Sequence, residues 1–403
     1  MIKLGCNTSL PAGWQWAEAG KVIDIRDGTH DSPKPVEVGI PLVTSKNLKN
    51  GKIDFSTCTN ISAEDHEQIS KRSAVDDGDI LYAMIGTIGN PVIVQGDKDF
   101  SIKNVALFKF SKSQVFNRFF YHLLGSSLIT QQFKKNARGG TQKFVSLGNI
   151  RALQIPLPPL DEQKRIAAIL DKADTIRQKR KQAIDLADEF LRSVFLDMFG
   201  DPVTNPKRWQ EYVLKDITNI RSGVAKGKKV SLDDSVTLPY MRVANVQDGY
   251  LDLSEIKQIV VSEKDANKCK LEKGDVLLTE GGDPDKLGRG YVWNNEIESC
   301  IHQNHIFSVR IDNHNFVHPH FLSAQISSQR GKLYFLKVGK QTTGIATINK
   351  TVLSDFVVFI PPLELQKKYV AIKNKLDDFK RKCEFDDLTL FRSISHKTFS
   401  GGV

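Results

Sequence analysis

The chain has 403 residues and a formal net charge of +10 at pH 7. This length allows two or three domains with their own cores, and the basic excess favours nucleic acid or an acidic surface as partner. No apolar run approaches a signal peptide or a membrane span, and the five cysteines show no pairing pattern, so we predict a cytoplasmic protein without a disulfide framework.

The first globular block is predicted to span residues 1–155 and to mix short strands with one helix. A helical stretch with a regular apolar face lies around residues 119–133, and the polar loop 138–143 follows it. A last strand is expected over residues 150–155. The other strands are expected in short β-rich runs bounded by glycine, aspartate or lysine: residues 22–25, 40–43, 78–82 and 105–108.

A long helix is predicted over residues 156–200. Pro158-Pro159 suits a helix start, and Asp161-Glu162 places negative charge at the positive end of the helix dipole. No proline or glycine follows until Gly200. A helix of roughly 39 residues is about 58 Å long, so we interpret it as a spacer. Apolar or small residues recur in it at steps of three and four, which is typical of a coiled-coil seam: Ile166, Ile169, Ala173, Ile176, Ala183, Ala187, Phe190 and Val194.

The second half of the chain repeats the first. The helix start Pro158-Pro159-Leu160 recurs as Pro361-Pro362-Leu363, 203 positions later. In the globular part, Gly78-Asp79-Ile80-Leu81 recurs as Gly274-Asp275-Val276-Leu277, 196 positions later. A repeat of about 200 residues indicates two whole domains rather than a solenoid, whose repeats are far shorter.

The fold class follows from this order of elements. We predict an α+β protein in which two globular α/β blocks, residues 1–155 and 201–360, are separated by two long spacer helices, residues 156–200 and 361–403. Since each block leads into a helix, an antiparallel coiled coil of the two helices places the blocks at opposite ends of the pair. The expected molecule has pseudo-two-fold symmetry and neighbouring chain termini.

Several motifs together resemble the DNA-specificity (S) subunit of type I restriction-modification systems. They are the two helix starts, the loop 139–143, the run Gly274-Asp275-Val276-Leu277-Leu278-Thr279 and the helix end at residues 194–202. The resemblance covers essentially the whole chain. It implies that each block is a target recognition domain and that the helices bind methyltransferase subunits. One departure is Glu364-Leu365-Gln366, where the family usually has a second acid before the glutamine.

The resemblance also implies partners and cofactors. Two methyltransferase (M) subunits would use S-adenosylmethionine to methylate an adenine in each half of a double-stranded DNA target, and restriction (R) subunits would use ATP and Mg. No cofactor is expected in this chain itself. The implied partner-binding residues lie at the two helix starts: Pro159, Leu160, Gln163, Pro362, Leu363 and Gln366.

The residues themselves form no recognisable catalytic motif. The Pro-Pro pairs lack the Asn/Asp-Pro-Pro-aromatic context of a DNA adenine methyltransferase, and residues 223–229 lack the spacing of a phosphate-binding loop. Cys300, His302 and His305 lack zinc-finger spacing, and Asp283-Pro284-Asp285 is typical of a turn. We therefore predict a non-catalytic subunit without a metal site. The alternatives are a stand-alone DNA methyltransferase or nuclease, and a coiled-coil scaffold for protein interactions.

Basic and polar loops are the predicted DNA contacts. Glycine lets a backbone approach phosphate, while arginine and glutamine can also read base edges in the major groove. Because these loops differ between the blocks, each block is expected to read a different half-site of an asymmetric, interrupted target. The candidate DNA-binding residues are Arg26, Thr29, His30, Arg138, Thr141, Gln142 and Lys143 in the first block, and Arg221, Lys226, Lys228, Lys229, Lys286, Arg289, Lys340, Gln341 and Thr342 in the second.

Overall fold

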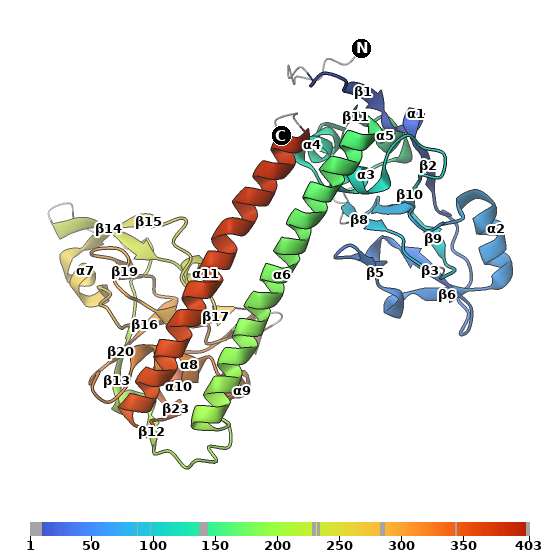
Figure 1. Cartoon of the computed structure of the whole chain (residues 1–403). Helices are drawn as coiled ribbons and strands as arrows, with labels where there is room; N and C mark the ends of the chain where they lie inside the picture. The colour runs from blue at the N-terminus through green and yellow to red at the C-terminus, as the bar shows by residue number, and fades with distance from the viewer. Residues whose placement is uncertain are drawn as a thin grey trace. The chain divides into compact units, whose positions relative to one another are not determined.

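The computed structural model describes residues 10–86, 88–96, 98–136, 144–227, 231, 234–282, 287–342 and 345–399. The chain forms two compact units: unit 1 comprises residues 1–182 and 383–403, and unit 2 comprises residues 183–382. Helix α6 (Leu160–Phe199) and helix α11 (Leu363–Phe399), both visible in Figure 1, each contribute one part to either unit. Each unit therefore combines one globular block with part of each long helix.

Unit 1 contains a four-stranded antiparallel sheet in the order β2-β10-β7-β8. These strands are β2 (Asp24–Asp27), β10 (Val105–Lys109), β7 (Ile80–Ala83) and β8 (Gly89–Ile93). A three-stranded sheet has the order β6 (Thr59–Ile61), β3 (Ile40–Thr44) and β9 (Ser101–Lys103). Two further pairs are β1 (Gln15–Glu18) with β11 (Gln154–Leu157), and β4 (Leu48–Lys49) with β5 (Lys52–Ile53). The helices of this block are α1 (Ala19–Val22), α2 (Ala63–Ser73), α3 (Asn117–Leu124), α4 (Ser127–Asn136) and α5 (Leu147–Arg151).

The central strands of this four-stranded sheet are buried on both faces. Successive side chains of a strand point to opposite faces, so Ile80 and Tyr82 of β7 join one apolar cluster while Leu81 and Ala83 join another. The continuous apolar run of β10 divides in the same way. Side chains of α3 and α4 cover the first face, and side chains from the β3 to β4 region cover the second.

Unit 2 repeats this architecture, as the duplicated sequence predicts. Its four-stranded antiparallel sheet has the order β13 (Thr218–Ser222), β20 (Ile306–Ile311), β16 (Val276–Thr279) and β18 (Gly290–Val292). A three-stranded sheet has the order β15 (Lys257–Ser262), β14 (Ser235–Met241) and β19 (Ile301–His302). β12 (Glu211–Val213) pairs with β23 (Val357–Phe359), and a small sheet contains β17 (Gly281–Gly282), β22 (Ile345–Thr347) and β21 (Lys340–Thr342). The helices are α7 (Glu263–Cys269), α8 (Pro319–Ile326), α9 (Gln329–Val338) and α10 (Lys350–Ser354).

The repeated Gly-Asp motif has a structural role in both units. Gly78 and Gly274 adopt positive φ angles of 83° and 97°, which favour glycine. The next residue, Asp79 or Asp275, is buried and accepts a hydrogen bond from a backbone amide three residues earlier. Its carboxylate also pairs with a base on the neighbouring strand, Lys109 in unit 1 and Arg310 in unit 2. The motif thus fixes a turn and places a buried carboxylate against a base of the neighbouring strand.

Replacement of Asp275 by alanine is expected to lower the free energy of unfolding of unit 2 by about 3–5 kcal/mol, the cost of removing one partner from a buried ion pair. The variant leaves Arg221 and Arg310, which both contact this carboxylate at 2.8 Å, without their buried partner. Chemical denaturation measures the effect. Asp355→Ala is the control, because its pair with Lys215 is half exposed and is worth about 1 kcal/mol or less. Equal losses for the two variants would contradict this assignment.

Burial raises the pKa of Asp275, but hydrogen bonds from Arg310 and the Glu272 amide outweigh that effect and hold the pKa below its usual value of 3.8. The carboxylate is therefore charged more readily in the folded protein than in the unfolded chain. Its contribution to stability is complete above the unfolded pKa and is lost as the pH falls through the lowered one.

The long helices pack as an antiparallel pair within each unit, as predicted. In unit 2, Phe195 and Phe199 near the end of α6 contact Tyr369 near the start of α11, with ring centroids 5.5 and 5.7 Å apart. In unit 1, Phe399 at the end of α11 joins the cluster that contains Ile166 from the first turns of α6. Among the described residues, none of the helices has the length and apolar character needed to cross a bilayer.

Two local predictions were wrong. The predicted seam includes Ile176 and Phe190, which are 43% and 55% exposed. The buried positions of α6 instead include Leu170 and Phe195, because each part of the helix packs against a globular block as well as against α11. Residues 150–155 are not one strand: α5 is capped by Ser146, whose hydroxyl accepts a hydrogen bond from the Asn149 amide, and β11 follows it.

Candidate nucleic-acid interface

The loops of unit 1 meet at one edge of its four-stranded sheet. Strands β2 and β7 both run antiparallel to β10, so both end where β10 begins. We call this the loop edge of unit 1 and define it by residues 28–31, 84–86, 104 and 144–145. The amide of Asn104 donates to the carbonyl of Thr29 at 3.2 Å, and the amide of Val145 donates to the carbonyl of Met84 at 3.0 Å. Arg138, Thr141, Gln142 and Lys143 lie outside the described residues, and Phe144, which follows them, is exposed at this edge.

A glycine at this edge and its equivalent in unit 2 let two backbone segments pack closely. A Cβ on Gly28 would stand 2.2 Å from the carbonyl oxygen of Ile102, and a Cβ on Gly223 would stand 2.0 Å from that of His302. The two glycines occupy equivalent positions, 195 residues apart. At both positions the chain that leaves the four-stranded sheet passes directly against the strand before Asn104 or Asn304, so any side chain would collide with its backbone.

His30 is held by two side-chain hydrogen bonds at the loop edge of unit 1. Its Nδ1 lies 2.9 Å from Oδ1 of Asn104, and its Nε2 lies 2.9 Å from a carboxylate oxygen of Asp27. Both neighbouring oxygens can accept a hydrogen bond, which favours the protonated ring. The hydrogen bond to Asn104 and then the one to Asp27 raise the pKa of His30 above 6.5. Both N–H groups already have partners, while much of the ring faces solvent.

Unit 2 has an equivalent loop edge, which we define by residues 224–227, 280–282, 289, 304–305, 340–342 and 345–347. Val224 accepts a hydrogen bond from the Asn304 amide, as Thr29 does from the Asn104 amide in unit 1. The amide of Glu280 donates to the carbonyl of His305 at 3.0 Å, and the amide of Ile348 donates to the carbonyl of Glu280 at 2.8 Å. Strand β17 then pairs with β22, which joins this edge to the small sheet.

Three predicted DNA-binding residues of unit 2 gather at this edge. Lys226 is exposed in the turn after β13, and Lys340 is exposed on β21 opposite Thr347 of β22. Arg289 is half-buried, and its guanidinium lies 3.4 Å from the side-chain oxygen of Gln247. Two more candidates, Gln341 and Thr342, lie in β21. Lys228, Lys229 and Lys286 lie outside the described residues.

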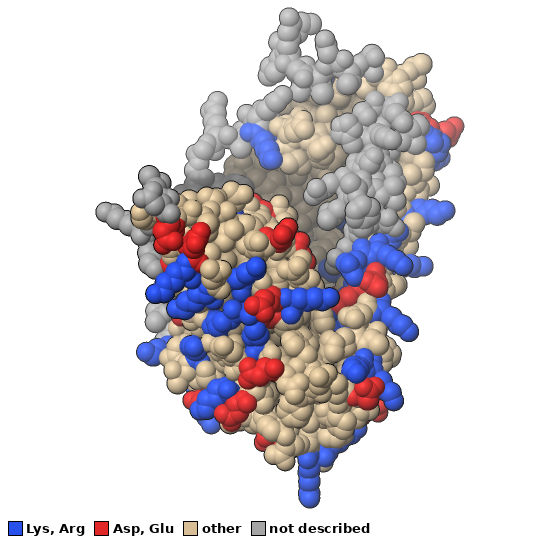
Figure 2. Space-filling view, turned by 90° about the vertical axis from the view of Figure 1, so that its left-hand side faces the viewer, with Lys and Arg blue, Asp and Glu red and all other residues tan. Residues whose placement is uncertain are grey.

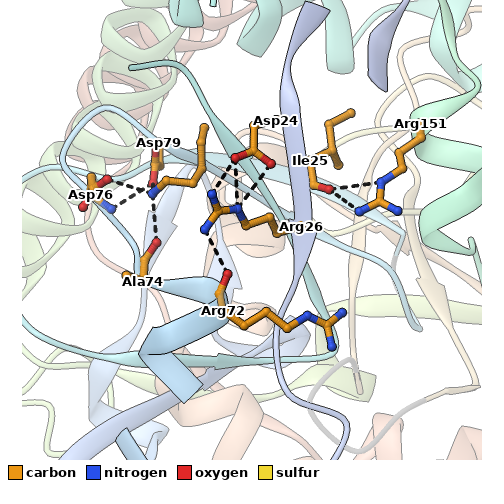
Figure 3. Close-up of polar contacts among 9 residues, drawn as sticks. Asp24, Ile25, Arg26, Arg72, Ala74, Asp76, Asp79 and Arg151 are labelled. Carbon is orange, nitrogen blue, oxygen red and sulfur yellow. Dashed lines mark hydrogen bonds and ion pairs between the residues drawn. The ribbon is translucent and has the colours of Figure 1, made fainter. Parts of the chain in front are cut away.

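Arg26 and Arg221 do not lie in loops as predicted. They occupy equivalent positions, 195 residues apart, within strands β2 and β13. Arg26 binds the carboxylate of Asp24 and donates to the carbonyl of Arg72 (Figure 3). Arg221 binds Asp275 and Ser308. Both guanidinium groups are committed to partners within their unit, which gives them a structural role.

An Asn-His-carboxylate chain was missed by the sequence reasoning and occurs at both loop edges. In unit 1 it is Asn104-His30-Asp27, and in unit 2 it is Asn304-His305-Glu280, where Nδ1 of His305 lies 2.6 Å from a carboxylate oxygen of Glu280. The recurrence of asparagine after 200 residues was the available signal. The carboxylates could not be found, because they come from non-equivalent positions on different strands.

The prediction that Gln163 and Gln366 bind a partner is corrected by their burial, since they are 2% and 0% exposed. Each amide is fully engaged with backbone atoms. Gln163 accepts from the amide of Phe116 and donates to the carbonyls of Gln114 and Pro158. Gln366 repeats all three bonds with the backbone of residues 318, 316 and 361. These glutamines fasten each long helix to the loop before α3 or α8.

The other residues of the helix starts stay accessible. Pro159, Leu160 and Pro362 are exposed, and Leu363 is half-buried. At the first helix start, in unit 1, Pro159 and Leu160 line an open groove of about 520 Å³. Its other lining residues are Gly13, Gln15, Ser113, Gln114, Leu157, Pro158 and Gln163. This groove carries no charged side chain, which distinguishes it from the loop edges.

Basic side chains are widespread on the surface. On the face seen in Figure 2, lysine and arginine gather in several clusters with aspartate and glutamate among them. Positive charge on this face is thus partly compensated. It does not by itself mark one DNA-binding patch, so the loop edges are the better-defined candidates.

Two copies of one fold, each presenting loops from the same edge of a sheet, define a repeated recognition protein. The model of the type I restriction modification DNA specificity domain matches residues 11–186 and 206–384. The chain belongs to this family, whose members are the non-catalytic, DNA-recognising subunits of type I restriction-modification systems.

Similarity to individual proteins extends over nearly the whole chain. The EcoKI specificity subunit of Escherichia coli K12 is 22% identical over 387 residues, covering 90% of this chain and 81% of that protein. The StySPI specificity subunit of Salmonella potsdam is 23% identical with the same coverage. A solved structure from a study of complex assembly in the type I R-M system has a TM-score of 0.56 at 19% identity, and the match covers 98% of this chain and 100% of that one. This last likeness shows a common fold.

Proposed function

We propose that each unit reads one half of a bipartite, asymmetric DNA target through its loop edge. The observation that carries the proposal is the repeated loop edge itself. The same strands end at it in both units, whereas the side chains differ. Unit 1 presents the imidazole of His30, and unit 2 presents a carboxylate, Glu280, together with Arg289 and Lys340. Different donors and acceptors select different base edges, so the two half-sites differ.

The chain is further proposed to direct two methyltransferase subunits and restriction subunits to that target. Its relatives are named as specificity subunits of type I restriction enzymes. Two equivalent helix starts favour two methyltransferase subunits, with Pro159, Leu160, Pro362 and Leu363 as contact points and the uncharged groove beside Leu160 as part of one contact. S-adenosylmethionine, ATP and Mg are then used by the partners and not by this chain.

A cytoplasmic location is part of the same proposal. DNA and its modifying enzymes share that compartment, and the four cysteines in the described residues, Cys58, Cys269, Cys300 and Cys383, form no disulfide, as a reducing environment favours.

Methyl transfer to DNA tests the proposal. The purified chain alone and the methyltransferase subunit alone are each expected to transfer no methyl group from S-adenosylmethionine, whereas the mixture does. Binding of the mixture to DNA should weaken steeply with salt, because phosphate contacts release counterions. Methyl transfer by the chain alone would make it an enzyme. A mixture that binds and methylates all sequences equally would show that the chain does not read DNA.

A further inference from the structure

Glu280 is held in a defined position at the loop edge of unit 2. It directly follows β16, and both its amide and its carbonyl are hydrogen-bonded, to His305 and Ile348. Its side chain is 30% exposed, so the carboxylate is neither buried nor freely solvated. One oxygen, Oε2, is engaged by His305, and the structure gives Oε1 no hydrogen-bond partner among the described residues. One acceptor therefore remains available at this edge.

The contacts of His305 hold the Glu280 carboxylate in place. The Nδ1–H of His305 donates to the carboxylate at 2.6 Å, while its Nε2 lies 3.4 Å from the side-chain nitrogen of Asn304. In unit 1, by contrast, His30 lies between the side-chain oxygen of Asn104 and the carboxylate of Asp27. That carboxylate is buried and also paired with Arg72, whereas the Glu280 carboxylate is partly exposed at its edge.

Phosphate repels a carboxylate on a DNA-contacting surface, and the donors that DNA offers to it lie on base edges. Its remaining oxygen needs a donor once DNA excludes water from the site. In the major groove, cytosine offers only its N4 amino group at its edge, whereas adenine places the N7 acceptor beside its N6 amino group. Guanine and thymine present acceptors there. The chemistry at Glu280 therefore matches cytosine best.

We propose that Glu280, oriented by His305, reads a cytosine in the half-site of unit 2 by accepting a hydrogen bond from its N4 amino group. This inference rests on the proposed function of the loop edges. It names a residue that determines specificity and the class of base it selects. Arg289 and Lys340 lie at the same edge and supply the positive charge that lets a carboxylate approach DNA.

Glu280→Gln tests the proposal with little change in shape. Glutamine still accepts the hydrogen bond from Nδ1 of His305, so a purely structural role is kept, but it can place an amide donor where Oε1 accepted. Glutamine pairs with adenine through N6 and N7. We expect preference for one cytosine in the unit 2 half-site to fall about five-fold or more, with adenine tolerated in its place, while the other half-site stays unchanged.

The measurement compares methylated sites in DNA treated with the complex of the methyltransferase and each variant. Glu211→Gln is the matched control, because Glu211 is also an ion-paired acid of unit 2 but lies on β12, paired with Arg330. Thermal unfolding of both variants monitors the fold. The proposal is overturned if the Glu280→Gln variant recognises an unchanged unit 2 half-site. It is also overturned if the variant loses its preference at an adenine position of that half-site and not at a cytosine position. If the wild-type complex methylates DNA without preference for any half-site, the proposed function fails as well. The two failures are therefore distinguishable.

Discussion

Phe399→Ala is expected to lower the free energy of unfolding of unit 1 by about 3–5 kcal/mol, although residue 399 lies far along the chain from residues 1–182, which form most of that unit. The ring of Phe399 is 7% exposed and packs against Phe119 of α3, with centroids 5.8 Å apart. The same cluster contains Leu170 of α6. A domain is stable by about 5–15 kcal/mol, so this loss removes much of the total.

The matched variant is Phe199→Ala, since the repeat places Phe199 against Phe321 in unit 2 at 4.9 Å. Hydrogen exchange read separately for each unit distinguishes the two. Phe399→Ala should reduce amide protection in β7 and β10, whereas Phe199→Ala should reduce it in β16 and β20. If Phe399→Ala affected only the amides of α11, the end of the chain would not be part of the unit 1 core.

Exchange of residues 1–155 for the equivalent block of a related specificity subunit is expected to replace one half-site completely and leave the other unchanged. Each block supplies most of an apolar cluster and has its own loop edge, so base contacts move with the block. At the junction, Gln163 binds only backbone atoms of residues 114, 116 and 158, so these hydrogen bonds do not require particular side chains there.

Mapping of methylated sites for the exchanged chain measures this effect. The control is the reciprocal exchange of residues 201–360, which should change only the second half-site. A change in both half-sites after either exchange would mean that the blocks do not read DNA independently.

The sequence predicted those structural features that a short local motif determines by itself. Gly78 and Gly274 need positive φ angles, and the buried acids after them pair with a base on the neighbouring strand, so the motif recurs in both units. The long helices could be predicted from their starts and from the lack of glycine or proline within them. The antiparallel pairing followed from chain order.

The candidate site was harder to predict because it depends on contacts between distant residues. A charged residue near a glycine gives the same sequence pattern in a loop and at the end of a strand. Arg221 was therefore predicted to lie in a loop, although it binds Asp275 within the sheet. Gln163 follows two acids and resembles a surface position, but the backbone of another element surrounds it. Glu280 and His305 are 25 positions apart, and only the meeting of β16 and β20 brings them together.

The central claim, that two unlike units read two unlike half-sites, is tested most directly by mapping methylated adenines in the genome of a host that expresses this chain with its methyltransferase, against the same host without them. We expect one new motif with two different half-sites separated by a fixed number of unspecified bases. A continuous motif, a palindromic one, or methylation without sequence preference would contradict the account.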